Sequence, residues 1–419
     1  MLGNYLKISI AVLVRRKFLT FVNLFGATLT LTVLVVAYAL FDSIVSPAGA
    51  QHRQDQMLLV TRLTLTNTRL DNRWSSFLGQ AFFDRHIATL ETPDRVSFAT
   101  MPNTATSYLD GRKITSQMRR TDAAYWELLD FDVIDGRVLS ADDVKFGRHV
   151  AVLNVATADS YFLGAVAVGE TIAVGPETFE VVGVVANEPE TSILAYADIW
   201  VPITTVPAQR ESWIGDGIAM LWFDDPGRMA LAREEYQEAV ATFEPIDDPA
   251  ELDKATSIAA TAFELFAQDM LENYFDEDSG AIDFVARFVA ICIVLALLFM
   301  ALPAINMANL NVGRILERAP EIGLRKAAGA STRVLIGQFV FENVVLSLLG
   351  GLLAFAVAPI VLGILNDTVF TYGRLNLSFS VFVAGLVFVL VFGVMSGIYP
   401  AWKMARLQPA ACLRGAQHV

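Results

Sequence analysis

The sequence is poor in the side chains from which metal sites and disulfide frameworks are built. Its 419 residues include two cysteines, Cys292 and Cys412, and four histidines. Neither cysteine lies in the long polar part of the chain, residues 42–282, so no disulfide can stabilise that part. The histidines are scattered, and no His/Cys spacing matches a metal site: His52, His86, His149 and His418. The sequence therefore predicts neither a disulfide-rich domain nor a metal centre.

Two catalytic motifs are also missing. None of the seven lysines directly follows a glycine, whereas a phosphate-binding loop of the Walker A type needs Gly-Lys followed by Ser or Thr. No G-x-S-x-G nucleophile elbow occurs. The adjacent acids Asp142-Asp143 and Asp247-Asp248 are typical of turn or helix-cap residues. We therefore predict no catalytic residues, no cofactor bound by this chain and no enzymatic activity of its own.

Charged residues are few, at 18%, and hydrophobic residues reach 54%, against about 25% and 45–50% in soluble domains. The apolar excess lies in four blocks, each long enough for the roughly 20 residues that cross a bilayer: 18–41, 283–310, 333–365 and 379–401. A cleaved signal peptide is the alternative for 18–41, because Ala48-Gly49-Ala50 resembles a cleavage site, but this apolar block exceeds the usual 7–15 residues. We predict four transmembrane helices.

Charge is distributed unevenly along the chain. The long polar segment carries a net charge of about −21 and the remainder about +8, which does not suit nucleic-acid binding. Lys and Arg gather in 1–17, 311–332 and 402–419, so these segments should face the cytoplasm. Segments 42–282 and 366–378 should then lie outside, with both termini inside. The predicted fold class is an α-helical membrane protein with one plus three transmembrane helices around a large α+β extracytoplasmic domain.

The pattern within 42–282 supports mixed α/β structure. Residues 171–175 and 178–185 are β-rich runs separated by a Gly-Pro turn, which predicts a hairpin, and 150–155 and 199–203 have strand patterns. Helices are expected at 229–243 and at 251–275, the second with Asp248 and Pro249 as its cap and first turn. The aromatic residues are expected to be core anchors, with a binding surface as the alternative: Trp74, Tyr108, Tyr125, Trp126, Trp200, Trp213 and Trp222.

The loop 311–332 contains a short, separately capped helix by its pattern. Pro320 suits a first helical turn, and Glu321 and Arg325-Lys326 match the positive and negative ends of the helix dipole. Gly329 ends the helix, and Ser331 can cap the next apolar block. An amphipathic connector anchored by its basic residues is the alternative reading, and the residue pattern leaves both open.

Three stretches carry a resemblance to a known family. Residues Glu321 to Ser331 are similar to the R-E-I-G-I-R-R-A-L-G-A-S loop of the MacB/FtsX family of ABC-transporter permeases, with Pro320 as a departure. Gly397 to Ala410 resembles that family's C-terminal signature. Tyr125 to Arg137 and Phe179 to Val185 look like parts of its periplasmic core. The resemblance implies a MacB-like periplasmic core domain over 42–282 and an FtsX-like permease domain over 283–414.

The resemblance also implies partners and a location. A separate ABC-type ATPase would bind ATP and Mg, and a second permease copy, identical or paralogous, would complete the transporter in the bacterial inner membrane. A periplasmic adaptor and an outer-membrane duct are further partners that the resemblance leaves open. The ATPase contact would be a coupling helix formed by Glu321, Ile322, Gly323, Leu324, Arg325, Lys326, Ala327, Ala328 and Gly329.

Two functions follow from such a protein. The first is mechanotransmission, in which ATPase motion moves the extracytoplasmic domain to export or extract hydrophobic, peptide or lipid-linked substrates. The alternative is a signalling or scaffold permease that controls an extracytoplasmic enzyme such as a cell-wall hydrolase. Glu342 is a separate candidate, because an ionisable residue inside a membrane span is a functional candidate by default, with a structural hydrogen bond as the other interpretation.

Overall fold

The computed structural model describes residues 17–45, 49–67, 69, 72–109, 111–206, 212–243, 254–272, 274, 281–317, 331–368, 375 and 377–405. The chain forms two compact units. The first, here the helical unit, comprises residues 1–42, 287–369 and 375–419. The second, here the α+β unit, comprises residues 43–286 and 370–374.

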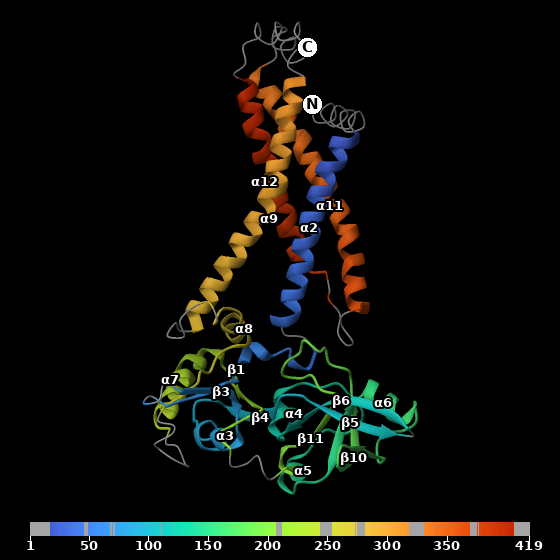
Figure 1. The fold of residues 1–419 in the computed structure, drawn as a ribbon, viewed down its shortest axis with the longest axis vertical. Coiled ribbons are helices and arrows are strands. Elements are labelled where there is room, and N and C mark those ends of the chain that lie inside the picture. The colour runs from blue at the N-terminus through green and yellow to red at the C-terminus, as the bar shows by residue number, and fades with distance from the viewer. Residues whose placement is uncertain are drawn as a thin grey trace. The chain divides into compact units, whose positions relative to one another are not determined.

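Long helices make up the described part of the helical unit (Figure 1): α2 (Lys17–Val45), α9 (Ala281–Glu317), α11 (Thr332–Thr368) and α12 (Phe379–Ala405). Each of the four apolar blocks of the sequence is helical. Two segments among the described residues are long and apolar enough to cross a membrane, Thr20–Ser43 and Val340–Thr368. Phe379–Met395 is apolar but shorter.

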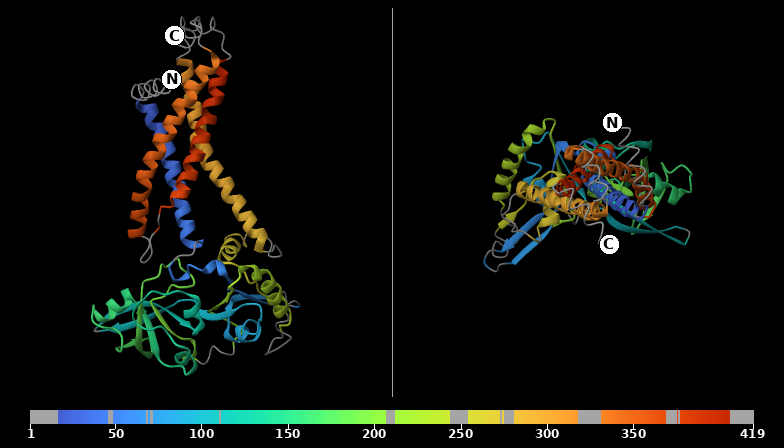
Figure 2. Two further views of the ribbon diagram at one scale, coloured as in Figure 1. Left: turned by 180° about the vertical axis from the view of Figure 1, so that it is seen from behind. Right: turned by 90° about the horizontal axis from the view of Figure 1, so that it is seen from above.

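Small residues allow α2, α11 and α12 to pack closely. A Cβ atom on Gly350 of α11 would lie 2.8 Å from the Ala27 Cβ of α2, and one on Gly351 would lie 2.4 Å from Leu386 of α12. The Thr28 hydroxyl also donates to the Gly350 carbonyl at 3.2 Å. Such close backbone approach is typical of helix pairs packed through small residues. These three helices therefore form one tightly packed group, as both side views show (Figures 1 and 2).

A mixed sheet of fourteen described strands organises the α+β unit. Its main path runs β14-β2-β3-β13-β4-β6-β11-β8-β10-β7, with β1, β12, β5 and β9 paired at its sides. The strands are β1 (Met57–Val60), β2 (Leu63–Asn67), β3 (Asn72–Leu78), β4 (Arg95–Thr100), β5 (Asn103–Leu109), β6 (Arg112–Thr121), β7 (Val133–Gly136), β8 (Val150–Asn154), β9 (Thr171–Val174), β10 (Glu177–Val185), β11 (Ile199–Pro202), β12 (Ile214–Gly215), β13 (Gly217–Trp222) and β14 (Lys254–Thr256).

Helices cover the two ends of this sheet and give the unit two lobes. α3 (Gln80–His86) and α7 (Met229–Ala241) pack at one end, and α6 (Val155–Phe162) packs at the other (Figure 1). Each lobe has its own apolar cluster, containing Phe82 and Tyr236 in the first and Phe179 in the second. A third cluster includes Met57 of β1 and Trp200 of β11, so it joins the lobes into one body.

Most local predictions for this unit are confirmed. β9 and β10 form the expected hairpin, with Glu177 opposite Val174, and α7 falls within the expected helix at 229–243. The helix expected at 251–275 is wrong as a single element. Lys254–Thr256 instead forms edge strand β14 on β2, and α8 (Ala262–Leu271) begins only after Thr261. Thr261 and Glu264 form a capping box there, which fixes the start of α8. Asp248 and Pro249 lie outside the described residues.

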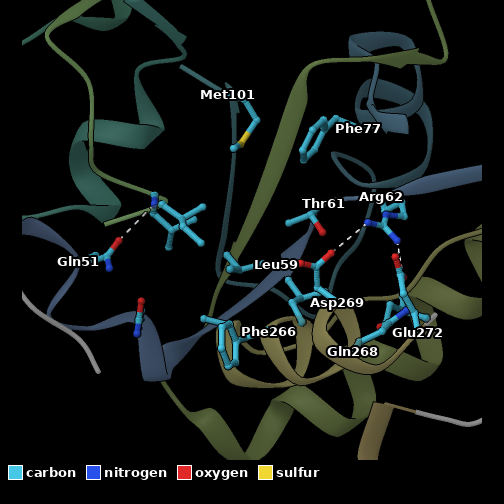
Figure 3. Close-up of a pocket in the computed structure, with 16 residues that line it drawn as sticks. Gln51, Leu59, Thr61, Arg62, Phe77, Met101, Phe266, Gln268, Asp269 and Glu272 are labelled. Carbon is cyan, nitrogen blue, oxygen red and sulfur yellow. Dashed lines mark hydrogen bonds and ion pairs between the residues drawn. The ribbon is translucent and has the colours of Figure 1, made fainter. Parts of the chain in front are cut away.

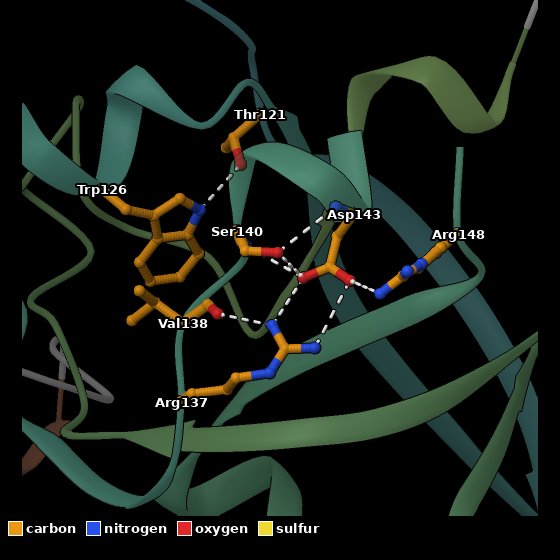
Figure 4. A network of polar contacts seen from close by, with 7 residues as sticks. All are labelled: Thr121, Trp126, Arg137, Val138, Ser140, Asp143 and Arg148. Carbon is orange, nitrogen blue, oxygen red and sulfur yellow. Dashed lines mark hydrogen bonds and ion pairs between the residues drawn. The ribbon is translucent and has the colours of Figure 1, made fainter. Parts of the chain in front are cut away.

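The structure also tests the predictions made for the seven aromatic residues and for Asp143. Five of the seven aromatic residues are buried as core anchors, whereas Trp74 and Tyr108 are exposed. Asp143 is a cap residue: it forms a capping box with Ser140 at the start of α5 (Ala141–Lys145). Burial opposes its charge, but hydrogen bonds from Arg137 and Ser140 hold the pKa of Asp143 well below its usual range (Figure 4). Arg148 also contacts this carboxylate, at 3.3 Å.

Candidate functional site

The α+β unit contains a cavity of about 270 Å³. One wall comes from α8 and from Ile258, which precedes that helix in the chain. Among its α8 residues are Ala262, Leu265 and Phe266. The facing wall includes Phe77 of β3 and Met101, which lie across the opening from Phe266 (Figure 3). The cavity is also lined by Gln51, Leu59 and Arg62 from the segment 49–62, and by Ile193 and Leu194 from the β10–β11 loop.

Two of the segments that line this cavity stand next to the long helices α2 and α9 in the sequence. The segment 49–62 is the first described part of the chain after α2, and α8 is the last helix before α9. The cavity wall is therefore built in part from the two described segments of the α+β unit that stand next to α2 and α9 in the sequence.

A buried carboxylate holds the first of these segments. Glu188, in the β10–β11 loop, is 5% exposed, and both its side-chain oxygens lie 3.2 Å from the backbone nitrogen of Ala50. Gln51 accepts a hydrogen bond from the Leu194 N–H at 3.2 Å. Gly49 has φ of +56°, and a Cβ there would lie 2.2 Å from a Glu188 oxygen, so both backbone conformation and space require glycine. We call these contacts of residues 49–51 with the β10–β11 loop the clasp.

Burial raises the pKa of Glu188 to about 7, although the Ala50 N–H favours the charged form. The carboxyl group therefore titrates near neutral pH. Only its ionised form accepts from Ala50 with two equivalent charged oxygens, so the clasp changes with pH.

The β10–β11 loop is itself fixed from within the core. Arg119 of β6 is fully buried and donates hydrogen bonds to the carbonyl oxygens of Leu194 and Ile193, the latter at 2.6 Å. The Tyr125 hydroxyl donates to the Leu194 carbonyl at 2.8 Å and accepts from Trp200 Nε1 at 3.3 Å. Burial raises the pKa of Tyr125, which keeps its hydroxyl proton available as a donor. The two loop residues that line the cavity are thus held in place.

Polar groups occupy the α8 side of the cavity. Arg62 contacts both Glu272 and Asp269, the second at 3.4 Å (Figure 3). The hydrogen bond that Arg62 donates to Glu272 is the main reason that the pKa of Arg62 is raised. Gln268 Oε1 is buried and has no hydrogen-bond partner within the described part of the chain.

Of the residues expected from the sequence to be functional, Glu342 is described and does not line this cavity. The coupling residues 321–329 lie outside the described residues. Glu342 is buried in α11 of the helical unit at 4% exposure, next to the equally buried Asn343. Ser331 caps α11 as expected, since it accepts from the Val334 N–H at 3.4 Å. Among the described residues, no cluster of three or more His, Cys, Asp or Glu side chains is placed to hold a metal ion.

Sequence reasoning missed the cavity and the clasp. Their residues come from five separate parts of the chain, and no short motif connects them. The one local signal is Gly49 followed by Ala50 and Gln51, and this stretch of sequence also resembles a signal-peptide cleavage site.

Comparison with known proteins defines the class. Residues 20–239 match the model of the MacB-like periplasmic core domain, and residues 293–409 match that of the FtsX-like permease C-terminal domain. The two matches together cover most of the α+β unit and most of the helical unit, which is the organisation of an ABC transporter permease. The chain belongs to the family of permeases with a MacB-like periplasmic core domain. It is therefore a membrane protein, and its α+β unit is the periplasmic domain.

Individual relatives agree with this assignment. The chain is 28% identical to the ABC transporter permease YvrN of Bacillus subtilis, over 71% of this chain and 70% of the relative. It is 21% identical to the macrolide export ATP-binding/permease protein MacB of Mannheimia succiniciproducens, over 97% of this chain but 60% of the relative. The match to MacB of Pasteurella multocida, at 23% identity, covers 72% of this chain and 43% of that protein. The chain thus spans about half the length of these MacB relatives.

Solved structures include similar domains. The crystal structure of the periplasmic region of MacB from Actinobacillus actinomycetemcomitans aligns over 54% of this chain and 94% of that structure, with 16% identity and a TM-score of 0.36.

Proposed function

We propose that this chain is the transmembrane subunit of an ABC exporter that couples ATP hydrolysis on a separate nucleotide-binding subunit to motion of its periplasmic domain. The observation that carries the proposal is that one cavity is lined both by residues 51–62, which follow α2 in the sequence, and by α8, which precedes α9. The two family matches support it. Hydrophobic, peptide or lipid-linked molecules on the periplasmic side are the proposed substrates.

In this proposal all four long helices cross the inner membrane, with both termini in the cytoplasm. Residues 321–329 bind the ATPase, and ATP-driven association of two ATPase subunits brings two permease copies together. The close contacts of Gly350 and Gly351 with α2 and α12 favour movement of these helices as one group. Chain residues 46–48 then lead from α2 to the clasp, where Glu188 holds Ala50.

Movement can be passed on only if the connections resist deformation. At the clasp, the Ala50 N–H donates to both Glu188 oxygens, and Gln51 accepts from the Leu194 N–H. Outside the clasp, the Ala50 carbonyl accepts from the Asp130 N–H at 2.9 Å. On the α9 side, the Thr261–Glu264 capping box and the pairing of Arg62 with Glu272 hold α8. These contacts support a mechanical rather than a chemical role for the domain.

The proposal is tested by inverting charge in the coupling segment. The double variant Arg325→Glu/Lys326→Glu should lose co-purification with the ATPase and its stimulation, because both charges lie in the proposed contact. The double variant Lys403→Glu/Arg406→Glu is the matched control, since it changes charge equally on the same side of the membrane but outside that contact. Unchanged ATPase binding and stimulation in the first variant would contradict the coupling assignment.

A further inference from the structure

We propose that the clasp is a two-position switch in which the Glu188 carboxylate exchanges the Ala50 N–H for the buried guanidinium of Arg119. This structure shows the first position, with the carboxylate on Ala50. The second position is reached when residues 49–51 are withdrawn from the β10–β11 loop. The inference rests on the proposed function, because motion of α2 would withdraw these residues, and it adds a second stable state to that connection.

Glu188 is a buried anion with a single hydrogen-bond donor. The residue is 5% exposed, and among the described residues the Ala50 N–H is the donor that reaches its carboxylate. Burial is the main cause of the raised pKa of Glu188, and the Ala50 N–H opposes it; no described cation contributes. A buried carboxylate that loses its donor is costly, so Glu188 needs another partner once the clasp opens.

Arg119 is a buried cation whose described hydrogen bonds all go to uncharged oxygens. These are the carbonyl oxygens of Ile193 and Leu194 and the hydroxyl of Tyr125, the last at 3.4 Å. The residue is fully buried, and its Nε atom has no hydrogen-bond partner in the described part of the chain. Buried donors are paired in most folded proteins. The guanidinium therefore has a donor left over for a carboxylate oxygen.

The two charges belong to one set of contacts. Burial raises the pKa of Tyr125, the charge of Arg119 acts against this, and the charge of Glu188 adds to it. Both charges are thus within electrostatic range of the same hydroxyl group. Leu194 joins them as well, since its carbonyl accepts from Arg119 and its N–H donates to Gln51 of the clasp at 3.2 Å. We expect the Glu188 carboxylate, once released from Ala50, to rotate toward this guanidinium.

Gly49 defines the closed position of the switch. A Cβ at residue 49 would lie 2.2 Å from Oε2 of Glu188, so the carboxylate packs directly against the backbone of that residue. A larger side chain at position 49 displaces the carboxylate without removing the Ala50 N–H. The chain therefore offers two independent ways to open the clasp, one by sterics and one by deletion of the donor.

The exchange of partners gives the connection two discrete arrangements. With the clasp closed, the hydrogen bonds of residues 50 and 51 tie this segment to the β10–β11 loop. With the clasp open, the ion pair of Glu188 with Arg119 offsets the loss of the Ala50 donor, so the open arrangement is stable. Packed elements with two such arrangements turn small displacements into discrete conformational changes.

The test deletes the donor and follows the protonation of Glu188. Ala50→Pro removes the N–H, and Ala50 lies in the short 3-10 helix Gly49–Gln51, whose usual φ proline adopts. The full chain in nanodiscs is titrated with pH, and infrared difference spectroscopy measures the carbonyl stretch of protonated Glu188. Glu188→Gln in the same background is the reference. No ATPase is present, so this outcome is separate from that of the export proposal.

The switch and its absence give changes of opposite sign. If Glu188 turns to Arg119 in Ala50→Pro, its proton affinity should fall about tenfold or more, because a neighbouring arginine stabilises the charged carboxylate to that extent. If no second partner exists, loss of the donor should raise the proton affinity above that of the unsubstituted chain, in which the pKa of Glu188 is about 7.

Three further variants complete the experiment. Gly49→Ala displaces the carboxylate but keeps the Ala50 N–H, so it should produce the same fall. Ala50→Gly keeps both the N–H and the space, so this matched control should titrate as the unsubstituted chain does. Ala50→Pro/Arg119→Met removes both partners, and its proton affinity should exceed that of the unsubstituted chain.

Two results would overturn the inference. The first is a proton affinity of Glu188 that is unchanged or raised in both Ala50→Pro and Gly49→Ala. The second is a fall in Ala50→Pro that persists when Arg119→Met is added, because another group would then be the second partner. A fall in both single variants that Arg119→Met reverses would establish the switch.

Discussion

Replacing Glu188 by Gln should make the periplasmic domain less sensitive to pH. Burial raises the pKa of Glu188 from 4.5 to about 7, so the folded domain holds this proton more tightly than the unfolded chain does. A raised pKa contributes stability that is fully present below pH 4.5 and is lost as pH rises through 7. At 1.36 kcal/mol per pKa unit, the loss is at most about 3 kcal/mol.

Glu188→Gln removes this titration while keeping an oxygen near the Ala50 N–H. Relative to the unsubstituted chain, the variant should therefore gain up to about 3 kcal/mol between pH 5 and pH 8. For a domain of this size that corresponds to a relative gain in Tm of up to about 6–12 °C. Thermal unfolding of the full chain in detergent can be followed by tryptophan fluorescence, because five of the six tryptophans lie in the α+β unit.

The unsubstituted chain and Glu188→Gln share all other carboxylates, so the difference between their Tm values removes the contribution of those groups to the pH dependence. Glu180→Gln on the exposed side of β10 is the control and should follow the unsubstituted chain at both pH values. A Tm that falls in parallel for the unsubstituted chain and for Glu188→Gln between pH 5 and pH 8 would refute the reasoning, because another group would then be responsible for the pH dependence.

Three further substitutions test the packing around the site by thermal unfolding or hydrogen exchange. Gly183→Ala puts a Cβ 2.0 Å from the Arg137 carbonyl oxygen, so it should cost about 1–3 kcal/mol, whereas Gly337→Ala meets nothing within 4 Å and should not lower Tm. Arg119→Met leaves buried carbonyl groups of the β10–β11 loop short of donors, so it should cost about 2–3 kcal/mol; an unchanged Tm would contradict the role given to Arg119. Thr261→Ala removes the α8 cap and should cost about 1 kcal/mol, seen as faster amide exchange confined to α8; uniform exchange across the domain would argue against it.

Local patterns of the sequence predicted the elements whose stability is local. The apolar blocks are helical because a long uninterrupted apolar run satisfies its backbone only within a helix, and the β9–β10 hairpin follows from β-branched residues flanking Gly175-Pro176. β14 was missed because Lys254–Thr256 is short and pairs with β2, nearly two hundred residues earlier in the chain. An edge strand of three residues has no periodicity to detect.

The candidate site could not be predicted from local sequence patterns, because its key residues are defined by contacts with distant parts of the chain. Arg119 stands next to Arg120 and has the appearance of a solvent-exposed basic pair, yet it is fully buried because three loop and side-chain acceptors surround it. Glu188 lies in a loop of acidic residues and proline, where its neighbour Glu190 gives no sign that one of the two is buried. Both roles depend on contacts with residues far away in the chain.

Motion of the periplasmic domain under control of the ATPase is the central claim, and a distance measurement tests it most directly. A nitroxide at Leu231→Cys, on the exposed side of α7, in a Cys292→Ser/Cys412→Ser background reports the separation of two copies by pulsed electron paramagnetic resonance. With the partner ATPase in nanodiscs, the distance distribution should differ between the nucleotide-free and the ATP/vanadate-trapped states, and Arg325→Glu/Lys326→Glu should abolish the difference. The same distribution in both states, with the ATPase active, would contradict the account.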